Sequence, residues 1–165
     1  MTASKKTIWL FCFFVYIYFL SHKIKNIMSC IYINLPVKDL SKSTQFYKDL
    51  WFTQNMQFSD QNASGMEWTK NIRVMLLTHD FTKQFLPEDK EVADSHKTCE
   101  VLNALDFTSK EEVNLFAEKA IAAGAKETKN YDYGFMYGRD FEDLDWHIRE
   151  AFFMDMSQMP QHTNS

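Results

Sequence analysis

Cysteine, glycine and proline are all scarce in this sequence: its 165 residues include 3 Cys, 4 Gly and 3 Pro. Cys12, Cys30 and Cys99 form no C-x-x-C pair, which excludes a zinc ribbon and a disulfide framework. The cysteines therefore indicate free thiols, which are compatible with a reducing compartment.

Basic residues are also scarce once the N-terminal end is set aside. The sequence has 18 Lys and Arg against 22 Asp and Glu, and four of the lysines lie in residues 1–29, which contain no acid. Taking those four away leaves 14 basic residues against 22 acidic ones in 30–165, a net charge of −8. Because nucleic-acid binding depends on neutralising phosphates, this acidic balance excludes DNA and RNA as partners.

What the sequence does contain is an ordinary apolar content of 45% and a high aromatic content of 16%. The apolar content excludes global disorder. The aromatic residues suit either a lined pocket or a large core.

The one long hydrophobic run, residues 8–20, lies near the N-terminus between Lys5-Lys6 and Lys23. A membrane-spanning helix needs about 20 apolar residues, so this run of 13 is short. Its length suits a signal peptide, although no small-x-small cleavage site follows. Three interpretations of the segment 1–29 stay open: an upstream extension, with Met28 as the true start, a membrane anchor, or a cleaved signal. If translation starts at Met28, the protein is expected to be cytoplasmic. Otherwise it is expected to be anchored in a membrane through residues 8–20.

Residues 30–79 predict a first β-α-β-β-β module. Apolar and polar residues alternate over 31–37, which is typical of a strand. A helix capped by Ser41 and ending near Trp51 follows. Strands are then expected at about 54–60, 65–70 and 72–78, with the first turn at 62–65.

After an acidic connection, 80–97, the same order recurs in 98–154. A strand is expected at 98–107, and a helix capped by Thr108 or Ser109 should run to about Ala123, with Gly124 directly after its end. Strands at about 126–130, 134–140 and 146–153 complete the second module, and 156–165 form a polar tail. This duplication predicts an α+β fold in which two βαβββ modules form a half-barrel cup, whose mouth is the expected binding site.

Several short motifs in this order carry a resemblance to a known family. They are NLPVKDL at 34–40, then SKEEV at 109–113, AGA at 123–125, DYGFMYGR at 132–139 and FEDLDWHIRE at 141–150. Over about residues 30–155 the chain resembles the vicinal oxygen chelate superfamily, which includes glyoxalase I, extradiol dioxygenases, and bleomycin- and fosfomycin-resistance proteins. The resemblance implies the same half-barrel fold and a homodimer.

Enzymes of that superfamily hold a divalent metal with four side chains. The resemblance places these four positions at Tyr32, near Leu76, at Leu102 and at Glu150. Of these four residues, only Glu150 has a side chain of the kind that usually binds a divalent metal. A catalytic metal site needs about three protein ligands. We therefore expect no cofactor; if a divalent metal were bound, Glu150 would be its ligand.

The sequence departs from the family pattern at two further places. Trp51 and Trp146 stand where the family has a small residue, glycine at the first, and Arg149 stands where it has an aromatic one. If these turns require positive φ, both tryptophans are strained, because side chains other than glycine tolerate that region poorly.

Strand alternation selects the residues expected to face the cup, with Glu150 either a catalytic base or a structural carboxylate. The predicted pocket residues are Tyr32, Asn34, Leu102, Asp106, Tyr137, Ile148 and Glu150. The histidines His79, His96 and His147 are expected to be exposed, and a metal site formed by His79 and His96 is the alternative.

Three functions stay open at this point. The first is a small-molecule-binding protein without the full metal site. The second is a metal-dependent lyase or isomerase resembling glyoxalase I, with Glu150 as its base. The third is a regulatory or interaction module whose cup is filled by its own side chains.

Overall fold

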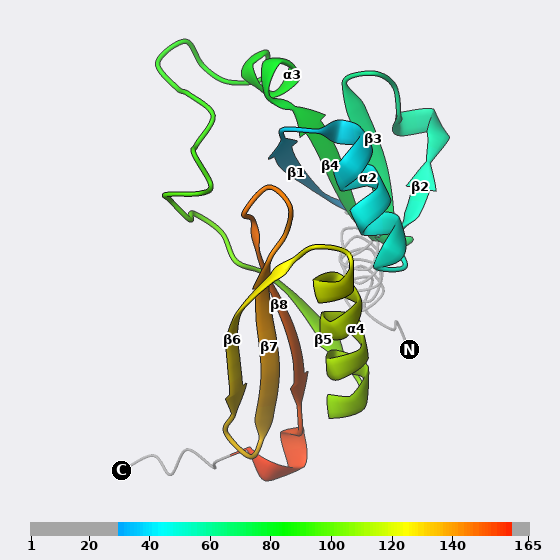
Figure 1. Ribbon diagram of the computed structural model, residues 1–165, viewed down its shortest axis with the longest axis vertical. Coiled ribbons are helices and arrows are strands. Elements are labelled where there is room, and N and C mark those ends of the chain that lie inside the picture. The colour runs from blue at the N-terminus through cyan, green and yellow to red at the C-terminus, as the bar shows by residue number, and fades with distance from the viewer. Residues whose placement is uncertain (1–29, 160–165) are drawn as a thin grey trace, which may run out of the picture. The chain divides into compact units, whose positions relative to one another are not determined.

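The structure, a computed structural model, describes residues 30–159 (Figure 1). The described residues from Tyr32 onward belong to one compact unit. The hydrophobic segment 1–29 lies outside the described residues, as does the end of the polar tail, 160–165. Within residues 30–159, no helix is both long and apolar enough to cross a membrane.

Module one contains one helix and a four-stranded sheet. Its elements are β1 (Ile31–Val37), α2 (Leu40–Asp49), β2 (Thr53–Asn55), the 3₁₀ helix η1 (Met56–Phe58), β3 (Ala63–Thr69) and β4 (Ile72–Thr78), and the strand order is β1-β4-β3-β2. The predicted strand 31–37 and the helix after it are thereby confirmed.

Three local predictions in this module are wrong. The strand expected at about 54–60 ends at Asn55, because η1 begins at Met56. Asp39, not Ser41, caps α2, because its Oδ1 accepts a hydrogen bond of 3.1 Å from the Lys42 N–H. The turn before β3 comes earlier than 62–65, because Asp60 Oδ1 accepts hydrogen bonds from the N–H groups of Asn62 (2.7 Å) and Ala63 (2.9 Å). That pattern closes an Asx turn and lets β3 begin at Ala63.

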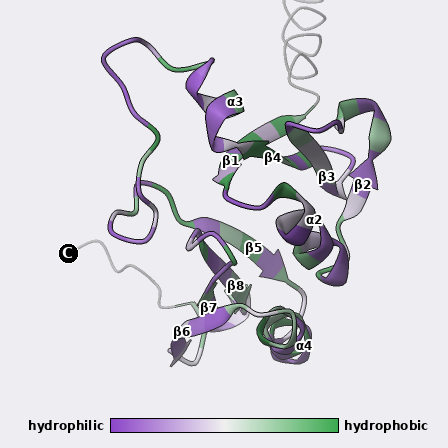
Figure 2. Cartoon of the chain, turned by 45° about the horizontal axis from the view of Figure 1, so that its top comes forward, coloured by the Kyte–Doolittle hydropathy of each residue, from purple (hydrophilic) through white to green (hydrophobic). Residues whose placement is uncertain are grey.

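The connection between the modules is longer than predicted. It contains the short helix α3 (His79–Lys83) and then runs without regular structure to Leu102. The expected strand 98–107 is reduced to β5 (Asn103–Phe107), because the N–H groups of Lys97 and Thr98 both bond to the Asp94 carbonyl and form a turn. Hydrophilic and hydrophobic stretches alternate along this connection (Figure 2).

Module two repeats the order of module one, as predicted. Its elements are β5, α4 (Lys110–Ala122), β6 (Lys126–Asp132), β7 (Met136–Glu142) and β8 (Ile148–Met154), and the strand order is β5-β8-β7-β6. The short 3₁₀ helix η2 (Met156–Gln158) follows. Ser109 caps α4 by accepting from the Glu112 N–H, and Gly124 has φ +105° directly after its end, as the sequence predicted.

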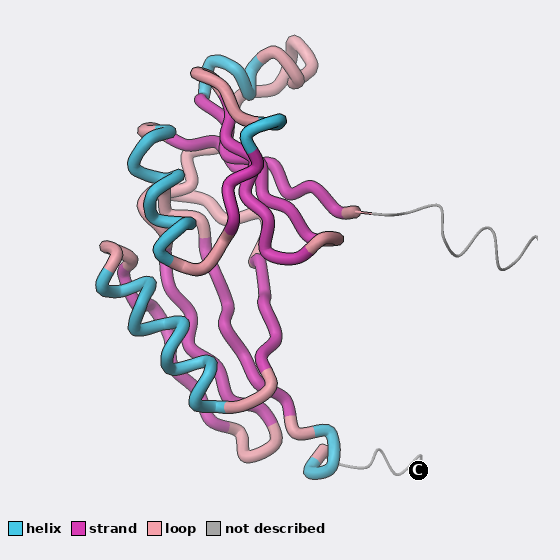
Figure 3. Tube along the Cα trace, turned by 90° about the vertical axis from the view of Figure 1, so that its right-hand side faces the viewer, coloured by secondary structure: helices cyan, strands magenta, loops and turns pink. Residues whose placement is uncertain are grey.

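The helices α2 and α4 cover the same side of the two sheets (Figure 3). Their apolar side chains meet in a single core, in which Phe116 of α4 packs at 5.5 Å between ring centres against Trp68 of β3. Phe46 and Leu50 of α2 belong to the same cluster. Because the helices cover one face of each sheet, the opposite face, here called the open face, is the one available for a ligand.

Both tryptophans that stand where the family has a small residue have a positive φ, the strained conformation that the sequence analysis considered for these turns. Trp51 has φ 68° and Trp146 has φ 63°. A side chain in this left-handed region costs on the order of 1–2 kcal/mol. Each turn therefore keeps the shape that glycine would favour, in spite of the large side chain.

Candidate functional site

A cavity of about 570 Å³ lies between the open face of module one, α3, the connection and the turn 143–147 that joins β7 to β8. Most of its wall is apolar. Its larger apolar side chains are Met75, Leu77, Phe81, Phe85, Leu86, Val92, Val101, Trp146 and Ile148. Its polar side chains are Asn34, Thr82, Glu91, Ser95, Thr98, Glu100, Asn103 and His147. A cavity of this size and composition suits a small organic molecule.

One wall of the cavity is formed by β4, whose side chains point alternately to its two faces. Val74 and Leu76 point into the core beneath α2, so their neighbours Met75 and Leu77 point to the open face and into the cavity. At the end of β4, Thr78 caps α3. This cap positions Phe81, whose ring packs edge-to-face at 5.1 Å against Phe85.

The turn 143–147 supplies the opposite wall through Trp146 and His147. His147 Nε2 lies 2.8 Å from the Pro36 carbonyl oxygen, and because a carbonyl only accepts, Nε2 is the donor. The Trp146 ring packs at 4.9 Å against His96. The prediction that His147 is exposed is therefore wrong: it is half-buried in the cavity wall, whereas His79 and His96 are exposed as expected.

Two buried carboxylates hold this turn in place. Asp145 accepts hydrogen bonds from the Lys38 N–H (2.7 Å) and the Ser43 hydroxyl (2.6 Å), both in module one. Asp143 Oδ1 accepts from the N–H groups of Asp145 (2.9 Å) and His147 (3.0 Å). The acidic residues of the family-like motif at 141–150 thus shape the cavity wall and do not themselves line it.

A second polar group lies on the open face of module two. Asp140 of β7 is directly opposite Glu150 of β8 in the antiparallel register. Asp140 is only 7% exposed, and its Oδ1 has no hydrogen-bond partner within residues 30–159. Burial, and then the charge of Glu150, raise the pKa of Asp140 to about 6, while Lys129 opposes the shift.

Tyr131 of β6 belongs to the same group. Its ring occupies the space where a Cβ on Gly138 would lie, which places its hydroxyl over β7. Burial, and then the charges of Asp140 and Glu150, raise the pKa of Tyr131 to about 12. The carboxylate pair is thus electrostatically coupled, as acid–base groups in enzymes are.

The structure brings only two of the predicted pocket residues to the cavity, Asn34 and Ile148. Tyr32 lies on the open face of β1 outside the cavity, where its hydroxyl accepts a hydrogen bond from Arg73 Nη1. Asp106 is exposed on β5, outside the wall. Glu150 faces Asp140 and also lies outside the wall.

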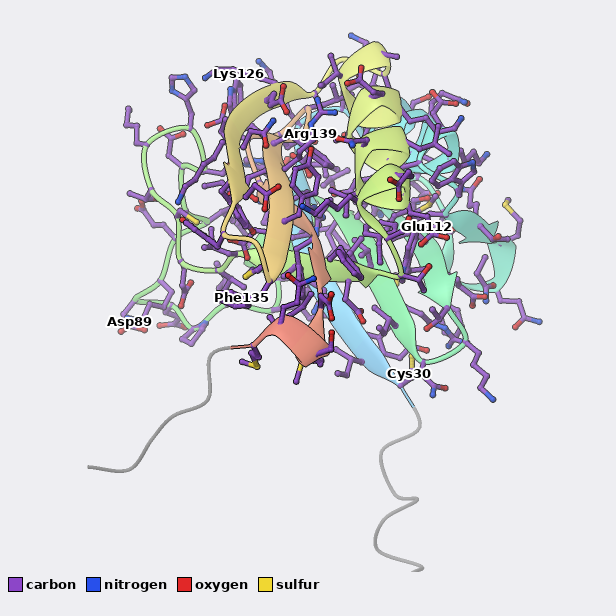
Figure 4. The ribbon with its side chains drawn as sticks, turned by 90° about the horizontal axis from the view of Figure 1, so that it is seen from below. Cys30, Asp89, Glu112, Lys126, Phe135 and Arg139 are labelled. Atoms are coloured by element: carbon purple, nitrogen blue, oxygen red, sulfur yellow. The ribbon has the colours of Figure 1, made fainter. Side chains whose placement is uncertain are left out.

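Two further predicted pocket residues, Tyr137 and Leu102, also lie outside the cavity wall. Tyr137 lies on the helix side of β7, where its hydroxyl donates a 2.7 Å hydrogen bond to Asn114 Oδ1 of α4. Arg139, two residues on, points to the same helix and lies between β7 and α4 (Figure 4). Leu102 precedes β5 and is 52% exposed, and its neighbours Val101 and Asn103 line the cavity instead.

The residues at the family's metal positions do not fit a divalent metal. Leu76 is fully buried under α2 and is not on the open face at all, and its neighbours Met75 and Leu77 offer no hard ligand. Among the other three metal positions, Tyr32, Leu102 and Glu150, only Glu150 offers a carboxylate. Within residues 30–159, no group of three or more His, Cys, Asp or Glu side chains could hold a metal ion.

Sequence reasoning missed most of the cavity wall. The connection, described from the sequence only as acidic, contributes Phe81, Phe85 and Val92, and Val101 comes from the expected strand 98–107. The available indication was that these apolar residues interrupt an otherwise acidic segment, which a purely solvated connection would not require. Trp146 was noted only as a departure from the family.

No family model and no curated protein matches the sequence, whereas solved structures match its fold. A hypothetical protein from S. aureus is 26% identical over 79% of this chain and 98% of its own, with a TM-score of 0.65. A glyoxalase/bleomycin resistance protein/dioxygenase family enzyme from Burkholderia phytofirmans is 20% identical over 74% and 96%, with a TM-score of 0.64. A fosfomycin resistance protein from Listeria monocytogenes is 22% identical over 79% and 97%, with a TM-score of 0.57. The predicted resemblance is thereby confirmed, and the chain has the βαβββ half-barrel fold of the vicinal oxygen chelate superfamily.

Proposed function

We propose that this protein binds a small apolar molecule in the cavity beneath the connection, and that it does so without a bound metal. The observation that carries the proposal is the cavity itself. Its volume of about 570 Å³ falls within the range of about 300–1,000 Å³ that is usual for ligand sites.

The composition of the wall supports an apolar ligand. Met75, Leu77 and Ile148 come from strands, and Phe81 and Phe85 from the helix and connection above them. A ligand that buries apolar surface against these side chains gains about 25 cal/mol for each Å² removed from water. Asn34 and Asn103 also line the cavity, and their amides would orient one polar end of the ligand.

A binding role without metal also agrees with the donor set. A divalent ion that loses its water needs several oxygen or nitrogen ligands, and the family positions supply only Glu150. Elemental analysis of the purified protein, and titration with Ni²⁺, Mn²⁺ and Zn²⁺, should therefore detect no stoichiometric metal. A metal bound through Glu150 would contradict this part of the proposal.

Thermal denaturation with 1-naphthalenemethanol, a neutral aromatic alcohol, tests ligand binding. A ligand that binds only the folded state raises the melting temperature as its concentration rises. Ile148→Trp fills the cavity and should abolish this increase. Phe152→Trp is the matched control, because Phe152 lies on the same face of β8 outside the wall.

The control should respond as the parent protein does. An unchanged response in Ile148→Trp would place the ligand elsewhere. No response in the parent protein to this alcohol would count against a binding role and in favour of a regulatory or interaction module.

A second candidate function is a lyase or isomerase resembling glyoxalase I. The pair Asp140 and Glu150 favours it, because a buried carboxyl whose pKa is raised to about 6 by burial and by the charge of a neighbouring carboxylate suits acid–base catalysis. Turnover of a hemithioacetal that is lost in Glu150→Gln would support an enzyme. The absence of turnover with any added metal would remove this candidate.

Two further points concern the protein as a whole. A homodimer stays a prediction, and light scattering that finds a monomer at micromolar concentration would contradict it. The three interpretations of the segment 1–29 stay open, and mass spectrometry of the native N-terminus distinguishes them.

A further inference from the structure

We infer that the cavity selects apolar ligands with a positively charged end, such as arylmethyl or alkyl ammonium ions, over neutral and anionic ligands of the same shape. This inference rests on the proposed function, because it names the class of molecule that the same cavity would bind.

The charges in the wall all have one sign. Two carboxylates, Glu91 and Glu100, line the cavity, and among the described residues no Lys or Arg does. Neither carboxylate makes a hydrogen bond or an ion pair within residues 30–159. Both are therefore available to a cation.

Two nearby acids, Asp94 and Asp80, differ from these two, because a local lysine already pairs with each of them. Asp94 lies 3.0 Å from Lys97 Nζ, and Asp80 lies 3.1 Å from Lys83 Nζ. The lysines of the connection that neutralise acids thus act outside the cavity wall, and the wall keeps its net negative charge.

Aromatic rings in the same wall add a second preference for cations. Phe81 and Phe85 pack edge-to-face, and Trp146 faces the cavity from the turn 143–147. The face of an aromatic ring attracts an ammonium group within about 6 Å, and more strongly when water is excluded. An anionic end would meet these ring faces and two carboxylates with no cation in the wall to pair with it.

The expected selectivity is moderate, because Glu91 and Glu100 are both exposed. Two opposite charges about 4 Å apart in water attract each other enough to change affinity about fivefold. We therefore expect an ammonium ligand to bind at least about fivefold more tightly than its alcohol, and a carboxylate ligand at least about fivefold more weakly.

Three probes that share one ring system test this: 1-naphthylmethylammonium, 1-naphthalenemethanol and 1-naphthoate, titrated by calorimetry at about pH 8. The preference for the ammonium probe should shrink in about 0.5 M NaCl, because salt screens exposed charges.

The double variant Glu91→Gln/Glu100→Gln should bind all three probes within about twofold of one another. Glu88→Gln/Asp89→Asn is the matched control, since it removes the same charge from the same connection at residues outside the wall. Asp89 lies at the outer edge of the connection (Figure 4). The control should keep the order of affinities of the parent protein.

The possible results distinguish a failure of the inference from a failure of the proposed function. Equal binding of ammonium and alcohol, tighter binding of naphthoate, or an equal loss of preference in the control variant would overturn the inference while the binding role stands. If none of the three probes binds, the proposed function fails and the inference fails with it.

Discussion

The hydroxyl of Tyr47, on α2 in module one, donates a 2.6 Å hydrogen bond to Asp143 Oδ2, in the turn of module two that carries the cavity wall. Arg149 donates to the same hydroxyl and lies 3.7 Å from the same carboxylate oxygen. All three side chains are buried. Burial raises the pKa of Tyr47 well above its usual value and Asp143 adds to the shift, while Arg149 opposes it. The two modules are thus joined by a buried, charged hydrogen-bond network.

Loss of this single hydroxyl should destabilise the protein measurably. Tyr47→Phe leaves Asp143 with one buried partner fewer, and a hydrogen bond to a charged group contributes about 1.5–3 kcal/mol. Tyr137→Phe is the control, because Tyr137 donates to the neutral amide of Asn114 in a partly buried place, where about 0.5–1.5 kcal/mol is expected. Urea denaturation measures both, and equal losses would show that the buried charge adds nothing.

The positive φ of Trp146 gives a second prediction. At φ 63° alanine keeps the strain of a side chain and loses the contact with His96, whereas glycine loses the contact but relieves the strain. Trp146→Gly should therefore be more stable than Trp146→Ala by about 1 kcal/mol. Chemical denaturation of the two variants measures the difference.

A regular helix position serves as the control, because there the alanine variant should be more stable than the glycine variant. Leu115 is exposed on α4, where glycine is less favourable than alanine by about 1 kcal/mol. Leu115→Ala should therefore be more stable than Leu115→Gly. If alanine were also the better residue at position 146, the strain assigned to Trp146 would be wrong.

The parts of the fold that could be predicted are those with local causes. The alternation over 31–37 and the Ser109 and Gly124 termini of α4 depend only on neighbouring residues, so the sequence contains their full explanation. The strained turn at Trp146 could be anticipated from the family resemblance. The turn at Asp60 was missed because two hydrogen bonds to its side chain, from the N–H groups of Asn62 and Ala63, decided it.

The site was harder to predict because it depends on contacts between distant segments. A change of one residue in strand parity reverses a side chain's face, which explains the error at Tyr137. The connection reaches the cavity with no periodic pattern, so Phe81 and Val101 could not be assigned to the wall. The pairing of Asp140 with Glu150 depends on a strand register that no local motif reveals.

The buried carboxyl of Asp140 predicts a pH-dependent stability. Its pKa of about 6 exceeds the ordinary 3.8, so the folded protein binds this proton more tightly than the unfolded chain does. This contribution to the free energy of unfolding is complete below about pH 4 and is lost as the pH rises through about 6. Asp140→Asn removes the term and should therefore become more stable relative to the parent protein across that window. Denaturation from about pH 4 to 7 measures it, and a constant difference between the two proteins would contradict the shift.

The charge of Glu150 is the second cause of that shift, and it can be removed separately. Glu150→Gln should move the titration midpoint of Asp140 to lower pH, while leaving it above 3.8, because burial is the larger cause and remains. Carboxyl ¹³C NMR follows the midpoint directly. Asp106→Asn is the control, since Asp106 is exposed on the same sheet and is not among the groups that act on Asp140. An unchanged midpoint in Glu150→Gln would show that the two carboxylates are not coupled, and would remove the observation that favours acid–base chemistry at this pair.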